Sequence, residues 1–429
     1  MPRPNDANSP CILFVVYGSG HIGKVAPVIK HLQAQGVSCE LLALTLGYKQ
    51  AQRLGLQPRG YRNFLHLVDC EAVLARGRQL LDGNTHPDVD PFESECYLGI
   101  NYQEWVDTHG EEAAAEKYRL AGRRGFLPLR FLGRVIDELR PAVVVSTGSP
   151  RSEQAAIEAA AQRGVPSLTM VDLFGLPHDN YLRNTVFADR ITVLSDFVRN
   201  NLANAGIDAS RIAVTGCPAY ETLFDPAHQQ AQHALRESLG WQDLRVIMWA
   251  GNLEEPGPGV TAEFLGTALA LDAERRLRAW VASRPDTALL IRYHPSQYHL
   301  FPDLGAYPRI YRSIPTQDPL APQLHLADSL VVQTSTVGFE AALIGKRVLC
   351  LSYSPMVINT DFDYGRLGLG ESVPRPDALV TALELGPQHP IDRSIFPPPG
   401  LATPRVAAEI VSLMDLPATK ITVISVESP

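Results

Sequence analysis

Short apolar runs that end in polar or glycine-containing turns, each followed by helical periodicity, recur along the chain. The first run covers residues 11–16 and ends in a turn at residues 17–21. Apolar positions spaced three and four residues apart then predict a helix from about Lys24 to Gln35, and a second strand follows at residues 38–44. Strand, turn, helix and strand in this order are typical of one βαβ unit of a parallel sheet.

The same pattern returns in two series, and no β-hairpin signal interrupts either of them. Further strands of the first series are predicted at residues 142–145, 167–171, 190–194 and 212–214, and strands of a second series at residues 246–249, 288–291, 330–332 and 348–351. We therefore expect an α/β protein with two doubly wound parallel sheets. The expected parts are a first domain (1–220), a polar helical connector (221–243), a second domain (244–395), and a tail with a helix (396–429) that packs back towards the first domain.

Composition restricts the classes of partner. The 429 residues are 45% hydrophobic and 20% charged, which is enough to build two cores. A net charge of −8, without a long basic run, argues against non-specific nucleic-acid binding. Neither a signal peptide nor an apolar run of about 20 residues stands out, so we expect a cytoplasmic protein with no integral membrane segment. The six cysteines are scattered, which favours reduced core thiols over disulfides or a zinc site.

The turn after the strand at residues 330–332 has the features of a phosphate and ribose site. Thr334, Ser335 and Thr336 stand between a strand end and a helix start, where free backbone N–H groups and the helix dipole favour an anion. Gly338 permits a close approach, and Glu340 lies about one turn further on, where it could accept hydrogen bonds from a diol. The alternative is structural, because Thr and Ser are common N-caps and Glu often compensates the helix dipole.

The first glycine turn and the segment at residues 82–105 are less specific. The turn at residues 17–21 lacks GxGxxG spacing, and Thr45 and Lys49 stand where an NAD-binding domain has an acid. The acidic and aromatic segment 82–105 is expected to be irregular, either a lid or acceptor-binding surface or a solvated loop. Its acids have no metal-loop spacing, and no metal site is expected. They are Asp82, Asp88, Asp90, Glu93 and Glu95.

Several segments, in the same order, resemble GT-B nucleotide-sugar glycosyltransferases and their relative, the UDP-N-acetylglucosamine 2-epimerase. They are GSGHIGKVAPVIKHLQAQG, AAIEAAAQRGVPSLTMVD, SRIAVTGCPAYETL, RYHP and TSTVGFEAALIGKRVL. The resemblance spans most of the chain and implies the GT-B fold, in which two Rossmann-like domains face each other across a cleft that binds the nucleotide. It also implies a nucleotide-sugar donor, UDP- or CMP/CDP-linked, with an acceptor and no tightly bound cofactor. A homodimer remains open.

Carried over position by position, the resemblance implies a nucleotide site in the second domain. Thr334, Ser335 and Thr336 would hold the donor phosphates, and Glu340 would hold the ribose. His294 would contact the nucleotide phosphate, with Arg292 two residues away on the same strand face. Gly251 and Asn252 would lie against the nucleotide.

The sequence also departs from the epimerase pattern. Residues 17–21 contain no Arg, so that only Lys24 remains as a cation there. Thr147 and Gly148 stand where an acid is expected, and residues 249–252 contain no His. Asp172 keeps an acid where the epimerases have Glu. These losses favour sugar transfer over epimerisation.

For transfer, His21 is the candidate general base, with Lys24 and Asp172 as further catalytic candidates. Asp172 could orient His21 or be the base itself. The structural alternatives are a helix-start or turn role for His21 and an N-cap role for Asp172. Two other functions stay open, an epimerase-like isomerase or hydrolase acting on a nucleotide sugar, and a non-catalytic nucleotide-sugar binding protein.

Overall fold

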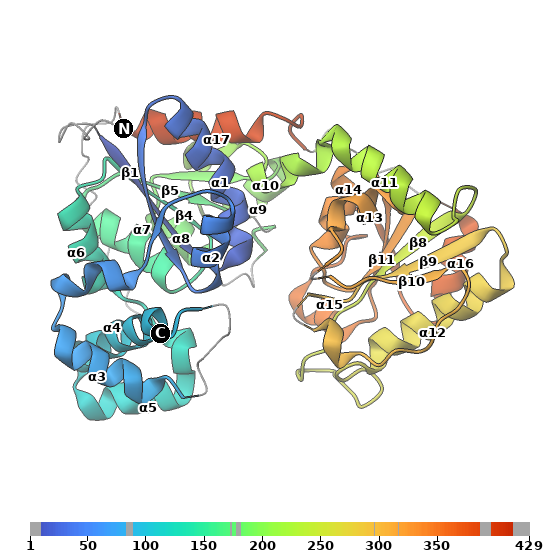
Figure 1. Cartoon of the computed structure of the whole chain (residues 1–429), viewed down its shortest axis with the longest axis horizontal. Coiled ribbons are helices and arrows are strands. Elements are labelled where there is room, and N and C mark those ends of the chain that lie inside the picture. Colours follow the sequence, from blue (N-terminus) through green and yellow to red (C-terminus); the bar gives the residue numbers. More distant parts are fainter. Residues whose placement is uncertain are drawn as a thin grey trace. The chain divides into compact units, whose positions relative to one another are not determined.

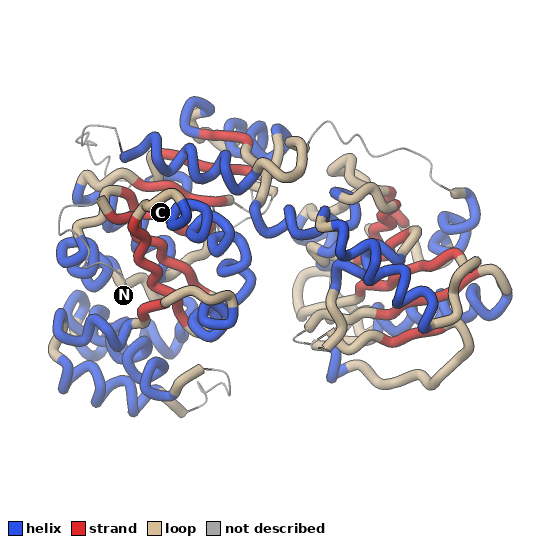
Figure 2. The backbone as a smooth tube through the Cα atoms, turned by 45° about the horizontal axis from the view of Figure 1, so that its top comes forward, coloured by secondary structure: helices blue, strands red, loops and turns tan. Residues whose placement is uncertain are grey.

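The computed structural model describes residues 10–82, 89–171, 174–176, 182–295, 297–315, 317–386 and 396–414. The chain divides into two compact units (Figure 1). The first unit comprises the described parts of Met1–Ala219 and Pro397–Pro429, and the second comprises the described parts of Tyr220–Phe396. Within each unit the strands lie inside and the helices lie outside them (Figure 2).

The first unit is built on a parallel sheet whose described strands have the order β3-β2-β1-β4-β5-β6-β7. In β1, Phe14 pairs with Leu41 on one side and with Val145 on the other. Because parallel sheets are covered on both faces, β1 is apolar without alternation. The strand order reverses between β1 and β4, which makes this pair the switch point of the sheet. The strands are β1 (Cys11–Tyr17), β2 (Ser38–Leu44), β3 (Pro58–Arg59), β4 (Val143–Thr147), β5 (Ser167–Met170), β6 (Arg190–Val193) and β7 (Ile212–Val214).

Helices from both ends of the first unit pack on this sheet. In α1 (Ser19–Ala34), Ile22, Val25 and Ile29 belong to the same buried cluster as the strands. Val406 and Ile410 of α17 (Ala402–Met414) join this cluster, and Figure 1 shows α17 near α1. The C-terminal helix is therefore part of the core of the first unit. The other helices on this sheet are α2 (Leu46–Arg53), α7 (Ser152–Arg163), α8 (Arg183–Phe187) and α9 (Asp196–Asn204), and α10 (Pro218–Glu221) contains the boundary between the units.

A group of helices between β3 and β4 corrects one expectation. The prediction of irregular structure is wrong for residues 91–105, because they belong to one long helix, α4, which Asp90 caps. Tyr97 and Trp105 of α4 are buried. The helix lies so close to α3 that a Cβ atom on Gly99 would be 1.9 Å from the Val73 carbonyl oxygen. The helices of this group are α3 (Cys70–Leu80), α4 (Pro91–His109), α5 (Glu111–Ala121) and α6 (Leu129–Leu139).

The second unit repeats the architecture with the strand order β10-β9-β8-β11-β12-β13, again all parallel. Val331 of β11 pairs with Trp249 of β8 and with Leu349 of β12, so the switch point of this sheet lies between β8 and β11. The strands are β8 (Arg245–Ala250), β9 (Thr287–Ile291), β10 (Ile310–Arg312), β11 (Ser329–Val332), β12 (Arg347–Leu351) and β13 (Glu371–Val373). The helices are α11 (Pro226–Ser238), α12 (Ala268–Ser283), α13 (Leu320–Leu326), α14 (Val337–Leu343), α15 (Pro355–Thr360) and α16 (Ala378–Leu385).

The predicted fold class, α/β with two doubly wound parallel sheets, is confirmed. None of the described helices combines the length and the hydropathy that a membrane crossing requires.

Candidate active site

His21 lies at the switch point of the first sheet. The predicted helix begins at Lys24, but α1 begins at Ser19, because Gly18 turns the chain at the end of β1 with a φ of 96°. His21 is therefore in the first turn of α1, beside the carboxyl end of β4. No side chain of the described residues caps α1 through a hydrogen bond.

A buried acid, Glu153, holds His21. Glu153 is in the first turn of α7, and its Oε1 lies 3.1 Å from Nδ1 of His21. The Thr147 hydroxyl, at the end of β4, is hydrogen-bonded to both side chains. Backbone N–H groups of Tyr17 (2.6 Å) and Ser149 (3.2 Å) donate to the same carboxylate. Thr147 and Gly148 stand where the resemblance implies an acid, and the carboxylate beside Thr147 comes from α7.

These contacts keep Glu153 ionised. Burial alone would raise the pKa of this fully enclosed carboxyl group. The electrostatic attraction to His21 and the hydrogen bonds from His21, Thr147 and Tyr17 outweigh burial, so that the pKa of Glu153 is lowered. A carboxylate on Nδ1 fixes the imidazole ring and its tautomer.

The other side of the His21 ring is accessible. The His21 side chain is 22% exposed, whereas Glu153 is 0% exposed. Among the described residues no hydrogen-bond partner of Nε2 is found, so this nitrogen is the one that a ligand would meet. An oriented imidazole with a buried carboxylate behind it and an open nitrogen in front is a common arrangement for a general base.

Backbone strain accompanies this site. Thr45, just after β2, has a φ of 51°, and Arg151, just before α7, has a φ of 70°. Both are non-glycine residues in a region that costs about 1–3 kcal/mol, and such strain is concentrated at functional sites. Both follow the carboxyl ends of strands that flank or form the switch point.

Of the two other catalytic candidates, Lys24 and Asp172, only Lys24 is among the described residues. Lys24 lies one helical turn after His21 on α1 and is half-buried. Asp172 lies outside the described residues. Their catalytic roles stay predictions.

The second unit places Thr334, Ser335 and Thr336 between β11 and α14, at the switch point of its sheet. Ser335 is buried, Thr334 is half-buried and Thr336 is exposed. A residue that sequence reasoning missed, Tyr364, fixes this turn. Its hydroxyl donates to the Ser335 carbonyl oxygen (2.7 Å) and accepts from the Phe339 N–H (2.9 Å).

Gly338 permits a close approach, as expected, but the group that approaches is the Tyr364 ring. A Cβ atom at Gly338 would lie 2.6 Å from Cζ of Tyr364. Glu340 follows in the first turn of α14 and is half-buried. The candidate ribose ligand therefore lies on the helix that carries the candidate phosphate turn.

Asn252 is tied to the end of β11. Its backbone N–H donates to Oε1 of Gln333 (2.9 Å), and Nε2 of Gln333 donates to the buried carboxylate of Glu254 (2.7 Å). The Asn252 side-chain oxygen is buried and has no hydrogen-bond partner among the described residues. Gly251 fits tightly, because a Cβ atom there would be 2.8 Å from the Trp249 ring. This network holds the loops after β8 and β11 together.

The Arg292 side chain forms hydrogen bonds within the second unit. Its Nη1 donates to the Ser313 hydroxyl (3.0 Å), the Asp318 carbonyl oxygen (2.9 Å) and the Gln323 side chain (3.0 Å). Burial lowers the pKa of Arg292, while the charges of Asp318 and Glu340 act in the opposite direction. These bonds favour a role in holding the loop after β10 over direct phosphate contact.

His294, two residues further on, is exposed, and its backbone N–H donates to the Gly251 carbonyl oxygen (3.2 Å). Partial burial of the imidazole lowers the pKa of His294, so that the ring is neutral near pH 7. As a phosphate ligand it would act as a hydrogen-bond donor and not as a cation.

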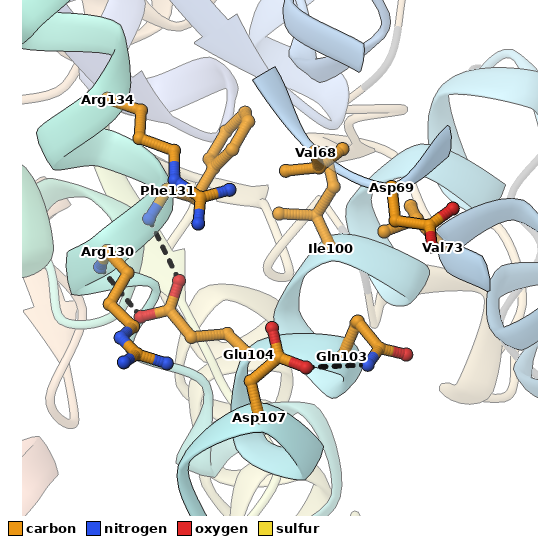
Figure 3. A pocket seen from close by; sticks show the side chains of 10 residues that line it. All are labelled: Val68, Asp69, Val73, Ile100, Gln103, Glu104, Asp107, Arg130, Phe131 and Arg134. Atoms are coloured by element: carbon orange, nitrogen blue, oxygen red, sulfur yellow. Dashed lines mark hydrogen bonds between the residues drawn. The ribbon is translucent and has the colours of Figure 1, made fainter. Parts of the chain in front are cut away.

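A further cavity of about 70 Å³ lies among the helices of the first unit (Figure 3). Glu104 of α4 accepts the Arg130 (2.8 Å) and Phe131 (2.9 Å) N–H groups and so caps the start of α6. None of the predicted site residues lines this cavity. Across the described residues, no group of three or more His, Cys, Asp and Glu side chains is arranged to hold a metal ion.

Comparisons with known proteins support the fold. No protein-family model and no curated protein matches the sequence. The chain is similar to the UDP-GlcNAc 2-epimerase of Neisseria meningitidis, solved with UDP-GlcNAc bound, at a TM-score of 0.57 and 14% identity, covering 94% of this chain and 100% of that one. The epimerase of Methanocaldococcus jannaschii gives a TM-score of 0.60 at 14% identity, with 94% and 99% covered.

A transferase is also similar. The wall teichoic acid polymerase TagF, in its H548A form, gives a TM-score of 0.54 at 13% identity, with 95% of this chain and 90% of that chain covered. At such identities the likeness shows the fold alone. The resemblance in the sequence is therefore confirmed for the fold. The chain has the two-domain GT-B-like fold that UDP-GlcNAc 2-epimerases and TagF have in common.

Proposed function

We propose that the chain is a GT-B-type glycosyltransferase that moves a sugar or a related group from a nucleotide-activated donor to an acceptor. The observation that carries the proposal is the pairing of His21 with the buried Glu153 at the switch point of the first sheet. Transfer needs one group that removes the acceptor's proton, and this pair supplies one.

In this proposal, His21 acts through Nε2. Glu153 accepts the proton on Nδ1 and leaves Nε2 as the basic nitrogen, which takes the proton of the acceptor hydroxyl. As Nε2 becomes protonated, the nearby carboxylate stabilises the imidazolium. Glu153 itself is enclosed and bonded to four donor groups, so it acts by positioning His21 and does not touch the acceptor.

The nucleotide is proposed to bind at the switch point of the second sheet. The turn at Thr334–Thr336 would hold the phosphates with backbone N–H groups and hydroxyls, and Glu340 would accept hydrogen bonds from the ribose. Two neighbours with this fold were solved with UDP-GlcNAc bound, which supports a nucleotide-sugar donor for this chain as well. UDP-, CMP- and CDP-linked donors are the candidates.

A second candidate is epimerisation of a UDP-amino sugar. The epimerase names of several neighbours favour it, and so does the presence of an acid, Glu153, near the place where the epimerase pattern has one. Epimerisation needs acid and base groups that reach the sugar. Glu153 is fully buried and faces His21, so this carboxylate does not reach a sugar. Transfer is the better supported of the two.

A thermal-shift panel tests the proposal. UDP, CMP, CDP, GDP and their sugars are added separately, and a ligand at about 100 times its Kd should stabilise the protein by about 2.7 kcal/mol. The stabilising nucleotide sugar is then incubated alone. Free nucleotide together with an epimerised sugar in the absence of an acceptor would favour the isomerase, and binding without turnover under any condition would favour a binding protein.

A further inference from the structure

Arg151 has an unusual set of neighbours for a half-buried cation. Its guanidinium carbon lies 4.1 Å above the centre of the Tyr17 ring, and its Nη1 donates to the Tyr17 hydroxyl at 3.3 Å. Within the described part of the chain no carboxylate pairs with it, and its buried Nε has no hydrogen-bond partner. A phenol and an aromatic face are weak partners for a guanidinium, whose donors match an oxyanion.

A second unsatisfied donor lies next to it. Tyr97 of α4 is only 4% exposed, and its hydroxyl, although close to the Tyr17 hydroxyl, makes no hydrogen bond of standard geometry with the described residues. The rings of Tyr97 and Tyr17 are 5.8 Å apart. Burial raises the pKa of Tyr97, whereas the positive charge of Arg151 opposes this rise, which agrees with a hydroxyl that lies near the guanidinium. Leaving a buried hydroxyl unpaired is costly, and such groups call for an explanation.

The backbone gives an independent reason to regard Arg151 as functional. Its φ of 70° belongs to the region that favours glycine, yet an arginine with a buried, unsatisfied donor stands there. Arg151 is also joined to the His21 site, because the Tyr17 N–H donates to Glu153 at 2.6 Å.

We propose that Arg151, Tyr17 and Tyr97 form a subsite for an oxyanion, a carboxylate or a phosphate group, carried by the acceptor that reacts at His21. This inference rests on the proposed function, in which His21 receives the acceptor. The anion takes the Nε–H and Nη–H donors of Arg151 together with the Tyr97 hydroxyl. Because Nε of Arg151 is buried, the anion enters as that side chain turns away from the Tyr17 ring, a rotamer change that is fast in partly exposed side chains.

The test is calorimetric titration of the full chain with inorganic phosphate and, separately, with acetate, at constant ionic strength near neutral pH. Saturating UDP is present, so that the proposed phosphate turn at Thr334–Thr336 is occupied. Arg151→Met should weaken binding at least about tenfold, because it removes charge-assisted bonds. Tyr97→Phe should weaken it about two- to tenfold and should leave the thermal stability unchanged or higher, because only an unpaired hydroxyl is lost. The matched control is Arg140→Met, which replaces another arginine with a positive φ at an exposed site.

The two ions distinguish the sources of the oxyanion. Loss of phosphate binding alone in the Arg151 and Tyr97 variants indicates a phosphorylated acceptor, and loss of acetate binding alone indicates an acidic one. The inference is overturned if neither ion binds the unmodified protein, or if both variants bind like Arg140→Met. UDP is titrated into the same proteins, and its binding should be unchanged in Arg151→Met. If UDP and the other nucleotides fail to bind the unmodified protein, the proposed function fails. The anion titrations still show whether Arg151 and Tyr97 bind an oxyanion.

Discussion

Nδ1 of His21 lies 3.1 Å from Oε1 of Glu153, although 132 residues separate the two in the sequence. The pair forms because β1 and β4 are neighbours in the sheet, so that the helices that follow them begin side by side. A parallel sheet with a reversal of strand order brings two loop ends together at one place, and here that place holds an imidazole and a carboxylate.

The ionised state of Glu153 should appear in the pH dependence of stability. Because the folded-state pKa of Glu153 is lowered, its contribution is complete above the unfolded value of about 4.3 and is lost as the pH falls towards the folded value. Urea unfolding should therefore give a lower free energy of unfolding for Glu153→Gln than for the unmodified protein at pH 7. This difference should narrow below about pH 4.3. Glu158→Gln, at a second buried glutamate of α7, is the control for loss of a carboxylate from this helix. A difference that stays constant or widens in acid would contradict this account of Glu153.

Tyr364→Phe should destabilise the second unit and loosen the candidate phosphate turn. The substitution removes the two hydrogen bonds of the Tyr364 hydroxyl, to the Ser335 carbonyl oxygen and from the Phe339 N–H, while these groups keep their bonds to the Gly338 N–H (3.0 Å) and the Thr336 carbonyl oxygen (3.0 Å). We expect this loss to lower the free energy of unfolding by about 0.5–1.5 kcal/mol. Tyr353→Phe is the matched control, because the Tyr353 hydroxyl is buried without a partner and its loss should be nearly neutral. Chemical denaturation measures both. Equal effects of the two substitutions would mean that the Tyr364 hydroxyl does not hold the turn.

Glu340→Gln should weaken ribonucleotide binding more than deoxynucleotide binding. A carboxylate that accepts two ribose hydroxyl groups loses a charge-assisted bond on neutralisation, with an effect of roughly 1–3 kcal/mol. Titrations with UDP and dUDP, or with the pair for the base found in the nucleotide panel, measure this difference. If both affinities fall by the same factor, Glu340 acts only on the helix dipole.

The strands and helices could be predicted because their signals are local. The predicted bounds of β2 (Ser38–Leu44) and β7 (Ile212–Val214) agree with the structure, since each is a short run with apolar residues that ends at a turn. The prediction for residues 91–105 failed because the aromatic side chains of α4 pack on other helices, and an acidic segment rich in turn residues hides that helical spacing.

The sequence could name candidate residues of the site but not the contacts between them, because the key contacts are long-range. His21 could be selected from its glycine turn, but no spacing rule connects it with Glu153. The bonds from Arg292 to Ser313, Asp318 and Gln323 depend on the loop after β10, which periodicity could not show, and a nucleotide contact by Arg292 stays a prediction. The role of Tyr364 depends on a ring that fits over a glycine, and sequence alone does not reveal that fit.

The central claim is that His21 is the general base. With the donor from the nucleotide panel and an acceptor in hand, the direct measurement is kcat for His21→Ala together with the Kd for the donor. His21→Gln preserves much of the side-chain shape and hydrogen bonding without taking a proton, and His31→Ala, on the same helix, is the control for loss of a histidine. The account predicts that kcat falls by roughly 10²- to 10⁴-fold in His21→Ala and His21→Gln while the donor Kd stays the same. Full turnover in His21→Ala, or loss of donor binding together with activity, would contradict it.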